Sequence, residues 1–193
     1  MKFITSLICY FMLLIVDNGS VFITEISNAI SKNRTEYTII PSQTIAKPDL
    51  NRFDSFVLSG RRRNDQKMNA INSEIIKHAL SEKKPLLGIC YGAEILALTL
   101  GGTIRKSADI IEGLHSVNVI KQNLLLDKNI EVYQSHSYEI AKLGSQLESV
   151  ASSDNCQHEI IKHQRLPIFG TQFHPEMSKD GQLLIKSFLK IIH

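Results

Sequence analysis

The sequence predicts an α/β fold: an open, mostly parallel sheet with helices on both faces and a small antiparallel extension. Apolar runs typical of buried parallel strands alternate with amphipathic helical segments through the first half of the chain. The second half carries short strand-like runs separated by turns, a pattern that favours antiparallel strands. One more amphipathic helix closes the chain.

The first half is expected to contain four strands and three helices. The run at 13–17 is almost continuously apolar, as in a strand that is buried on both faces. Ser20 is placed to cap the helix that follows, and Gly101 with Gly102 gives the signal that ends the third helix. The expected strands are 13–17, 37–40, 53–58 and 85–89, and the expected helices are 20–33, 65–81 and 91–100.

The second half is expected to contain five short strands and the closing helix. Active sites of parallel α/β sheets lie beyond the carboxyl ends of the strands. The motifs described below all fall at such ends. The expected strands are 117–120, 130–133, 147–151, 159–162 and 168–171, and the helix is 180–192.

The chain has 193 residues, and its length and composition indicate one globular domain, alone or with a short extension. A net charge of +3 is too weak to favour a nucleic-acid or membrane partner, and the basic cluster Arg61-Arg62-Arg63 is expected in a solvated loop. The cysteines Cys9, Cys90 and Cys156 form no CxxC pair, so neither a disulfide framework nor a metal site of that type is expected. This cysteine usage fits a reducing, cytoplasmic compartment.

The amino-terminal segment has two interpretations. Residues 3–16 form an apolar run that resembles a secretory signal but is too short for a transmembrane helix, and residues 17–20 offer no small-x-small cleavage site. We favour Met12 as the true start, with residues 1–11 an extension ahead of a domain at 12–193. A signal or anchor remains the alternative. The mass of the natively expressed amino terminus distinguishes the two.

The segment Gly88-Ile89-Cys90-Tyr91-Gly92 has the form of a nucleophile elbow between a strand and a helix. Side chains at 88 and 92 would crowd so sharp a turn, which explains both glycines. The start of the following helix would favour the thiolate of Cys90, its reactive form. A buried, inert cysteine beside a glycine turn is the alternative. Cys9 and Cys156 lack this setting and are predicted to be structural.

His174 is the predicted base, in Gln172-Phe173-His174-Pro175-Glu176 after the strand at 168–171. Glu176 can accept a hydrogen bond from one imidazole nitrogen while the other faces Cys90, which is the logic of a nucleophile, a base and a group that orients the base. A surface histidine with an incidental acid nearby is the alternative. The remaining histidines have no such setting: His78, His158, His163 and His193 are expected to be solvated, and His115, in a turn, is undecided.

These two motifs resemble the class I glutamine amidotransferases, and the resemblance covers most of residues 13–192. The opening segment 15–20, Tyr91 after the nucleophile and the pair Ser135-His136 look most like the amidotransferase part of GMP synthetases. The resemblance implies the flavodoxin-like sheet of that family, with no metal or organic cofactor.

The resemblance also implies a mechanism. Cys90 would attack the side-chain amide of glutamine to form a γ-glutamyl thioester. His174, held by Glu176, would protonate the departing ammonia and then activate water. Backbone N–H groups of Tyr91 and of the loop containing Gly60 and Arg61 would hold the oxyanion, and backbone near Ser135 and His136 would hold the α-amino and α-carboxylate groups of glutamine.

Two positions depart from the family pattern. Arg61 stands where the family usually has the second glycine of its oxyanion loop, and it should restrict a peptide flip there. Glu94 stands where the family usually has glutamine, four residues after the nucleophile. Its carboxylate could pair with the substrate ammonium or could disfavour the thiolate through like charge.

The sequence contains neither a phosphate-binding P-loop nor a dinucleotide fingerprint. A separate ATP-dependent synthetase subunit is therefore expected to receive the ammonia, with 61–63 as a candidate contact and GMP synthesis as the expected pathway. Two other functions stay open. One is a stand-alone γ-glutamyl hydrolase of the same fold, and the other is a catalytically weak regulatory subunit.

Overall fold

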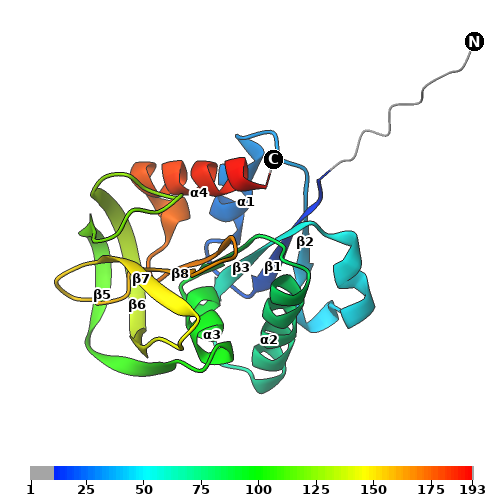
Figure 1. The fold of residues 1–193 in the computed structure, drawn as a ribbon, viewed down its shortest axis with the longest axis horizontal. Coiled ribbons are helices and arrows are strands. Elements are labelled where there is room, and N and C mark those ends of the chain that lie inside the picture. Colours follow the sequence, from blue (N-terminus) through cyan, green and yellow to red (C-terminus); the bar gives the residue numbers. More distant parts are fainter. Residues whose placement is uncertain (1–10, 193) are drawn as a thin grey trace, which may run out of the picture.

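A computed structural model describes residues 11–192, and these form a nine-stranded sheet with helices on both faces (Figure 1). The architecture confirms the predicted α/β class. The strands are β1 (Leu13–Asn18), β2 (Tyr37–Pro41), β3 (Ser55–Arg61), β4 (Leu86–Ile89), β5 (Thr103–Val119), β6 (Ile130–Lys142), β7 (Leu147–Ser152), β8 (Ile160–His163) and β9 (Ile168–Thr171). The helices are α1 (Ile23–Ser31), α2 (Gln66–Ser81), α3 (Tyr91–Thr99) and α4 (Lys179–Ile191), with short 3-10 turns η1 (Ser42–Thr44), η2 (Lys47–Arg52) and η3 (Pro175–Met177).

The strands lie in the order β2-β1-β3-β4-β9-β8-β7-β5-β6. β1 pairs in parallel with β2 and β3, and β4 pairs in parallel with β3 and β9. From β9 outward every pair is antiparallel. The carboxyl ends of β1, β3, β4 and β9 therefore meet at one edge of the sheet, and the segments that follow these strands come together there.

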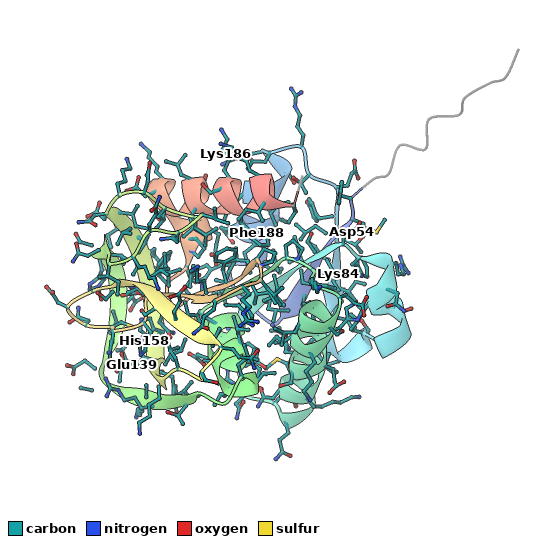
Figure 2. The ribbon with its side chains drawn as sticks, viewed as in Figure 1. Asp54, Lys84, Glu139, His158, Lys186 and Phe188 are labelled. Carbon is teal, nitrogen blue, oxygen red and sulfur yellow. The ribbon has the colours of Figure 1, made fainter. Side chains whose placement is uncertain are left out.

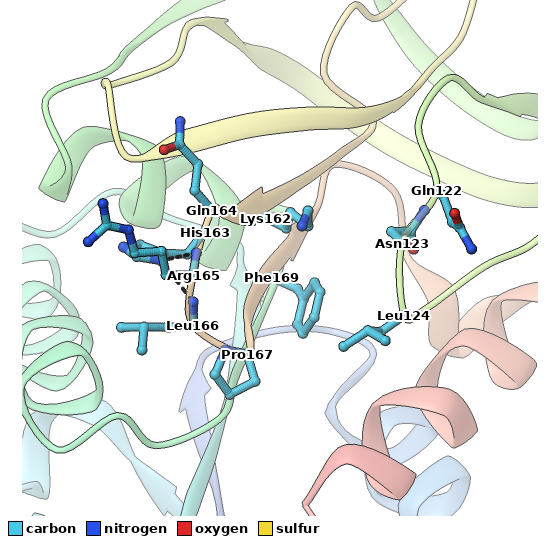
Figure 3. Close-up of a pocket in the computed structure, with 10 residues that line it drawn as sticks. All are labelled: Gln122, Asn123, Leu124, Lys162, His163, Gln164, Arg165, Leu166, Pro167 and Phe169. Carbon is cyan, nitrogen blue, oxygen red and sulfur yellow. Dashed lines mark hydrogen bonds between the residues drawn. The ribbon is translucent and has the colours of Figure 1, made fainter.

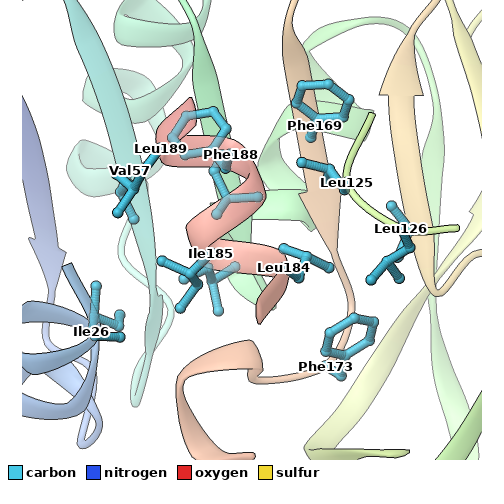
Figure 4. Close-up of a cluster of buried hydrophobic side chains, with 14 of the residues drawn as sticks. Ile26, Val57, Leu125, Leu126, Phe169, Phe173, Leu184, Ile185, Phe188 and Leu189 are labelled. Atoms are coloured by element: carbon cyan, nitrogen blue, oxygen red, sulfur yellow. The ribbon is translucent and has the colours of Figure 1, made fainter. Parts of the chain in front are cut away.

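Alternation along β1, which lies between β2 and β3, divides the core into two layers. Leu13 and Ile15 join a cluster with α1 and α4, whereas Leu14 and Val16 join a cluster with α2 and α3. Figure 4 shows the first cluster, where Phe188 of α4 packs edge-on against Phe169 of β9 with ring centroids 6.4 Å apart. β1 is therefore packed on both faces, by α1 and α4 on one side and by α2 and α3 on the other.

The expected start of the second helix is confirmed, and that of the first is wrong. The Asp65 carboxylate accepts from the Met68 amide at 2.7 Å and caps α2, which begins at the next residue. The first helix begins only at Ile23, because Gly19 at φ 80° turns the chain and Ser20 accepts from the amide of Phe22 instead of capping.

The antiparallel part is longer than the sequence indicated. The expected strands at 117–120 and 130–133 are only the end next to the connecting loop of a hairpin between β5 and β6, whose pairing runs from Val117 opposite Ile130 to Thr103 opposite Lys142. Many β5 side chains are exposed, so the strand shows little of the apolar alternation by which strands are recognised. Cross-strand pairing holds it instead. Residues 134–139 therefore lie on a strand and not in a loop.

Two histidines that were expected to be solvated are buried, so this prediction was wrong. His163 is 8 % exposed, and its Nδ1 accepts from the amides of Arg165 and Leu166 at the turn between β8 and β9. His158 is also 8 % exposed and lies near Glu139 (Figure 2). Burial lowers the pKa of both imidazoles. No local pattern marks either histidine as buried, because the β8 ladder and the turns beside it form only through long-range pairing.

The other predictions on histidine and cysteine were partly right. His115 lies on β5 rather than in a turn, His78 is half-buried, and Cys156 is buried as expected of a structural cysteine. Burial raises the pKa of the Cys156 thiol and keeps it protonated. Cys9, His193 and nearly all of the amino-terminal extension lie outside the described residues, so the interpretation of Met12 as the start stays a prediction. Within 11–192, no helix is long and apolar enough to cross a membrane.

Candidate active site

The turn between β4 and α3 places Cys90 where the glycine spacing predicts. Cys90 takes φ 50° and ψ −104°, a region that L-amino acids rarely adopt. A Cβ on Gly88 would lie 2.4 Å from the Gly92 carbonyl, and a Cβ on Gly92 would lie 2.4 Å from the Leu58 carbonyl oxygen. Close backbone approach therefore requires both glycines and holds the thiol at the sheet edge.

Cys90 sits at the amino end of α3. Its amide donates to the Thr171 carbonyl at 2.7 Å, which ties the turn to the end of β9. Its carbonyl accepts from the amides of Ala93 and Glu94. The first amides of a helix have no acceptor within the helix, and they give this end a partial positive charge. The position suits an anionic sulfur.

His174 reaches the same place from the end of β9. Its Nδ1 donates to Glu176 Oε1 at 2.9 Å, and both side chains are buried. Its amide donates to the Tyr133 carbonyl of β6 at 2.9 Å, and the Phe22 ring packs edge-on against the imidazole with centroids 4.8 Å apart. The ring is thus held by a carboxylate, a strand and an aromatic side chain.

The His174 imidazole also interacts with Cys90. Burial lowers the pKa of His174, but hydrogen bonds with Cys90 and Glu176 outweigh burial and raise the pKa to about 10. Because Nδ1 is engaged by Glu176, Nε2 is the nitrogen left for the thiol. An imidazolium beside a sulfur at a helix start is an arrangement that favours thiolate.

The loop at the end of β3 closes one side of the site. A Cβ added at Gly60 would lie 3.1 Å from His174 Cε1 and 3.9 Å from Cys90 Cβ, so the glycine lets the loop approach both side chains. The neighbouring Ser59 is fixed by Asn18, whose amide donates to Ser59 Oγ at 2.9 Å and whose side chain donates to the Ser59 carbonyl. Asn72 of α2 in turn exchanges side-chain hydrogen bonds with Asn18.

A cavity of about 230 Å³ opens beside Cys90. Its lining combines the elbow, the end of β3 with the loop after it, and the middle of β6, so it brings together six of the nine predicted site residues, whereas Gly60, His174 and Glu176 are not among its lining residues. The lining residues are Arg61, Arg62, Asn64, Cys90, Tyr91, Glu94, Ser135, His136, Ser137 and Tyr138.

Arg61 and Glu94, the two departures from the family pattern, face each other in this cavity. The Arg61 guanidinium lies 4.3 Å above the Tyr91 ring, and its Nη2 is 3.8 Å from Glu94 Oε2. Burial raises the pKa of Glu94, while Arg61 and a hydrogen bond from Gln172 oppose the rise. The Tyr91 hydroxyl donates to Asn69 at 2.7 Å. A charged Arg61 or a charged Glu94 would be costly to bury by itself, and the contact between the two side chains lowers that cost.

Sequence reasoning missed several residues that shape the site. Phe22 was placed only in a helix, although its ring contacts His174. Gln172 belongs to the quoted motif, but its role becomes visible only in the fold: it donates to Glu94 Oε1 and to the Tyr138 carbonyl and accepts from the Ile140 amide. Gln134 and Glu159 lie behind the cavity and had no signal in the sequence.

A larger cavity, of about 440 Å³, lies away from this chemistry (Figure 3). It surrounds the turn between β8 and β9 near Pro167, which precedes β9, whereas Cys90 is joined to Thr171 at the other end of that strand. Within the described chain, no group of three or more His, Cys, Asp or Glu side chains could hold a metal ion.

Comparison with known proteins assigns the family. A family model described as glutamine amidotransferase class-I matches residues 14–191. The chain belongs to the class I glutamine amidotransferase family. In this family context, the elbow at Cys90 and the pair His174–Glu176 occupy one site of the fold, as the two sequence motifs had indicated.

Relatives of this amidotransferase extend over nearly its whole length. It is 32 % identical over 187 residues to the glutamine-hydrolyzing GMP synthase subunit from Methanocaldococcus jannaschii, covering 93 % of this chain and 97 % of the relative. It is 30 % identical over 186 residues to the protein of the same name from Pyrococcus furiosus, with 93 % and 98 % covered.

Solved structures agree on the fold. A crystal structure described as that of a GMP synthase subunit from Thermoplasma acidophilum superposes with a TM-score of 0.85 at 28 % identity, covering 95 % of this chain and 94 % of that one. A glutamine amidotransferase from Thermotoga maritima, at 18 % identity, has a TM-score of 0.73 with 94 % and 84 % covered, and this likeness concerns the fold alone.

Proposed function

We propose that this amidotransferase hydrolyses glutamine to glutamate and ammonia and supplies the ammonia to a separate synthetase subunit for GMP synthesis. One observation carries the proposal: a strained cysteine at a helix start interacts with a buried His174–Glu176 pair beside a cavity of about 230 Å³. The names of the relatives at 30–32 % identity support the pathway.

In the proposed reaction, the Cys90 thiolate attacks the side-chain amide carbon of glutamine. The tetrahedral adduct collapses as His174 Nε2 transfers its proton to the nitrogen, which leaves as ammonia, and a γ-glutamyl thioester remains. Neutral His174 then takes a proton from water, which attacks the thioester and releases glutamate. Glu176 keeps the imidazole oriented and stabilises its charged form.

The oxyanion would be held by backbone N–H groups at two places. One is Tyr91, whose amide is at the first position of α3 and has no acceptor within the helix. The other is the loop of Gly60 and Arg61, which approaches both Cys90 and His174. Because Arg61 is extended at the end of β3 and its side chain is anchored on Tyr91, this loop is expected to resist rearrangement.

Glu94 is the proposed partner of the substrate α-ammonium. It lies one helical turn after Cys90, on the same face of α3, and lines the cavity. The backbone around Ser135 and His136 forms the opposite wall and would hold the α-carboxylate. Arg61 would exchange its contact with Glu94 for the incoming zwitterion, so substrate binding would begin by opening an ion pair.

The proposed partner is an ATP-dependent synthetase that docks over the cavity mouth. Arg62 and Arg63 are exposed beside the cavity, whereas Arg61 turns inward to Glu94. Arg62 and Arg63 are therefore the proposed contacts with the synthetase. The proposed amidotransferase domain spans 12–193.

The test is glutamate release by the purified chain and by the Cys90→Ala variant, each alone and with a nucleotide-bound GMP synthetase subunit. We expect release that depends on Cys90 and increases when the synthetase is added. Hydrolysis of longer γ-glutamyl compounds without stimulation would identify a stand-alone hydrolase instead. A folded chain that releases no glutamate under either condition would refute the proposed reaction.

A further inference from the structure

A chain of buried hydrogen bonds lies behind the cavity and links His136 to a second carboxyl group. His136 Nδ1 lies 2.9 Å from the Tyr138 carbonyl, and Nε2 lies 3.1 Å from the side-chain oxygen of Gln134. The other terminal atom of Gln134 lies 2.7 Å from Glu159 Oε1. Gln134 is 1 % and Glu159 0 % exposed, so water cannot complete these bonds.

The donors and acceptors along this chain restrict its protons. A carbonyl only accepts, so His136 Nδ1 carries a hydrogen. If the Gln134 oxygen faces Nε2, then Nε2 must carry one as well, so His136 is an imidazolium and the Gln134 NH₂ donates to a Glu159 Oε1 that carries no hydrogen. If the amide of Gln134 is turned over, its NH₂ donates to a bare Nε2, and its oxygen accepts from a protonated Glu159. The second arrangement leaves both His136 and Glu159 neutral.

Ser153 requires that Glu159 Oε1 also accept. The Ser153 hydroxyl oxygen accepts from the amides of Asn155 and Cys156, so its own hydrogen goes to Glu159 Oε1 at 2.7 Å. A protonated carboxyl oxygen can accept from Ser153 and donate to Gln134 at once. Both arrangements therefore satisfy every short contact, and charge decides between them.

The neutral arrangement is favoured, because the amide of Gln134 separates the two groups and they cannot neutralise each other directly. Burial raises the pKa of Glu159 and lowers that of His136. The charged or titratable groups that act on this chain are His174, His115, Glu139 and Cys156. Of these, His174 carries the proton that the proposed reaction uses, and a second imidazolium beside it would repel that charge.

We propose that Glu159 is a positioning residue that remains protonated and, through Gln134, fixes His136 as the neutral tautomer with its hydrogen on Nδ1. The Nδ1 hydrogen then holds the Tyr138 carbonyl, which also accepts from Gln172. The cavity wall from Ser135 to Tyr138 is thereby held in place, and His136 adds no second imidazolium beside His174. The effect on catalysis rests on the proposed function, whereas the protonation states do not.

The direct test is nitrogen NMR of His136 in the whole protein at neutral pH, assigned with a His136→Gln variant. We expect one protonated nitrogen, Nδ1, and one bare nitrogen, Nε2. Two protonated nitrogens on His136 would overturn the proposal, whether or not the protein hydrolyses glutamine.

The second test compares the unfolding of wild type and Glu159→Gln as pH is changed. An unfolded carboxyl loses its proton near its ordinary value of 4.5, whereas the folded Glu159 has a raised pKa and keeps the proton to higher pH. Glu159 should therefore lower wild-type stability, relative to the variant, as pH rises above about 4.5. Ser153 is partly exposed and can donate to water in the variant. A Glu159→Gln variant that loses stability relative to wild type as pH rises would refute a protonated Glu159.

Glu139→Gln is the matched control, because Glu139 is also buried but pairs with Arg105 at 2.7 Å. The contribution of Glu159 to the pH dependence of stability should persist in this variant. In activity, Glu159→Ala should raise the KM for glutamine by about tenfold, the scale of one unpaired buried polar group, with kcat changed less, and Glu159→Gln should restore KM. An unchanged KM in a folded Glu159→Ala variant would remove the positioning role.

Discussion

Replacing Glu176 by glutamine tests how much of the His174 charge depends on one hydrogen bond. The two side chains are joined at 2.9 Å and both are buried, so solvent screens the pair little. A hydrogen bond to a charged group is worth about 1.5–3 kcal/mol and a neutral one about 0.5–1.5 kcal/mol. The substitution should therefore weaken the imidazolium by about 1–2 kcal/mol, which is about one pKa unit.

The consequence should appear in the pH dependence of glutamine hydrolysis. The pKa of His174 is raised to about 10, so the acid that protonates ammonia is present at neutral pH and is lost as pH rises through that value. In Glu176→Gln, the alkaline fall in kcat/KM should move about one unit lower, and the plateau should drop about tenfold. The exposed Glu36→Gln serves as the control. An alkaline limb at the wild-type position in Glu176→Gln would show that the carboxylate does not set the imidazole charge.

Other substitutions probe the remaining parts of the site. Glu94→Gln should keep or raise glutaminase activity, and a kcat/KM more than about tenfold lower would show that the carboxylate itself is required. Gly92→Ala places a Cβ 2.4 Å from the Leu58 carbonyl oxygen; it should cost about 1–3 kcal/mol in unfolding titrations and abolish activity, and a stable, active variant would contradict the elbow geometry. Phe22→Ala removes the ring against His174 and should lower kcat more than it raises KM, which steady-state kinetics would show; an unaltered kcat would dismiss the contact. Replacing both Arg62 and Arg63 by glutamine should weaken synthetase binding most at low salt. A variant that binds the synthetase as tightly as wild type at every salt concentration would exclude these arginines as contacts.

Local patterns predicted the parts of the site that depend on local chemistry. Glycine at 88 and 92 indicates a turn in which backbone atoms approach closely. In the fold, a Cβ added at either position would lie 2.4 Å from a backbone atom. His174 and Glu176 are two residues apart across a proline, so their hydrogen bond needs little more than the local backbone. The sheet order also brings both motifs to one edge, because β4 and β9 are parallel neighbours.

Long-range contacts explain what the sequence did not reveal. Gln134 and Glu159 are buried against each other although β6 and β8 are separated by β5 and β7 in strand order, and nothing in either segment marks the pairing. The hairpin of β5 escaped prediction because its side chains are largely exposed and show no regular apolar alternation. His163 is buried only because the turn after β8 folds its backbone amides onto the ring.

The role of Cys90 as the nucleophile is tested by the mass of the protein quenched with acid during turnover of glutamine. A thioester mechanism predicts an adduct of one γ-glutamyl group that maps to Cys90, is absent from Cys90→Ala and forms slowly in His174→Ala. Glutamate release from a folded protein without any adduct at Cys90, or release that survives in Cys90→Ala, would contradict a thioester mechanism at this site.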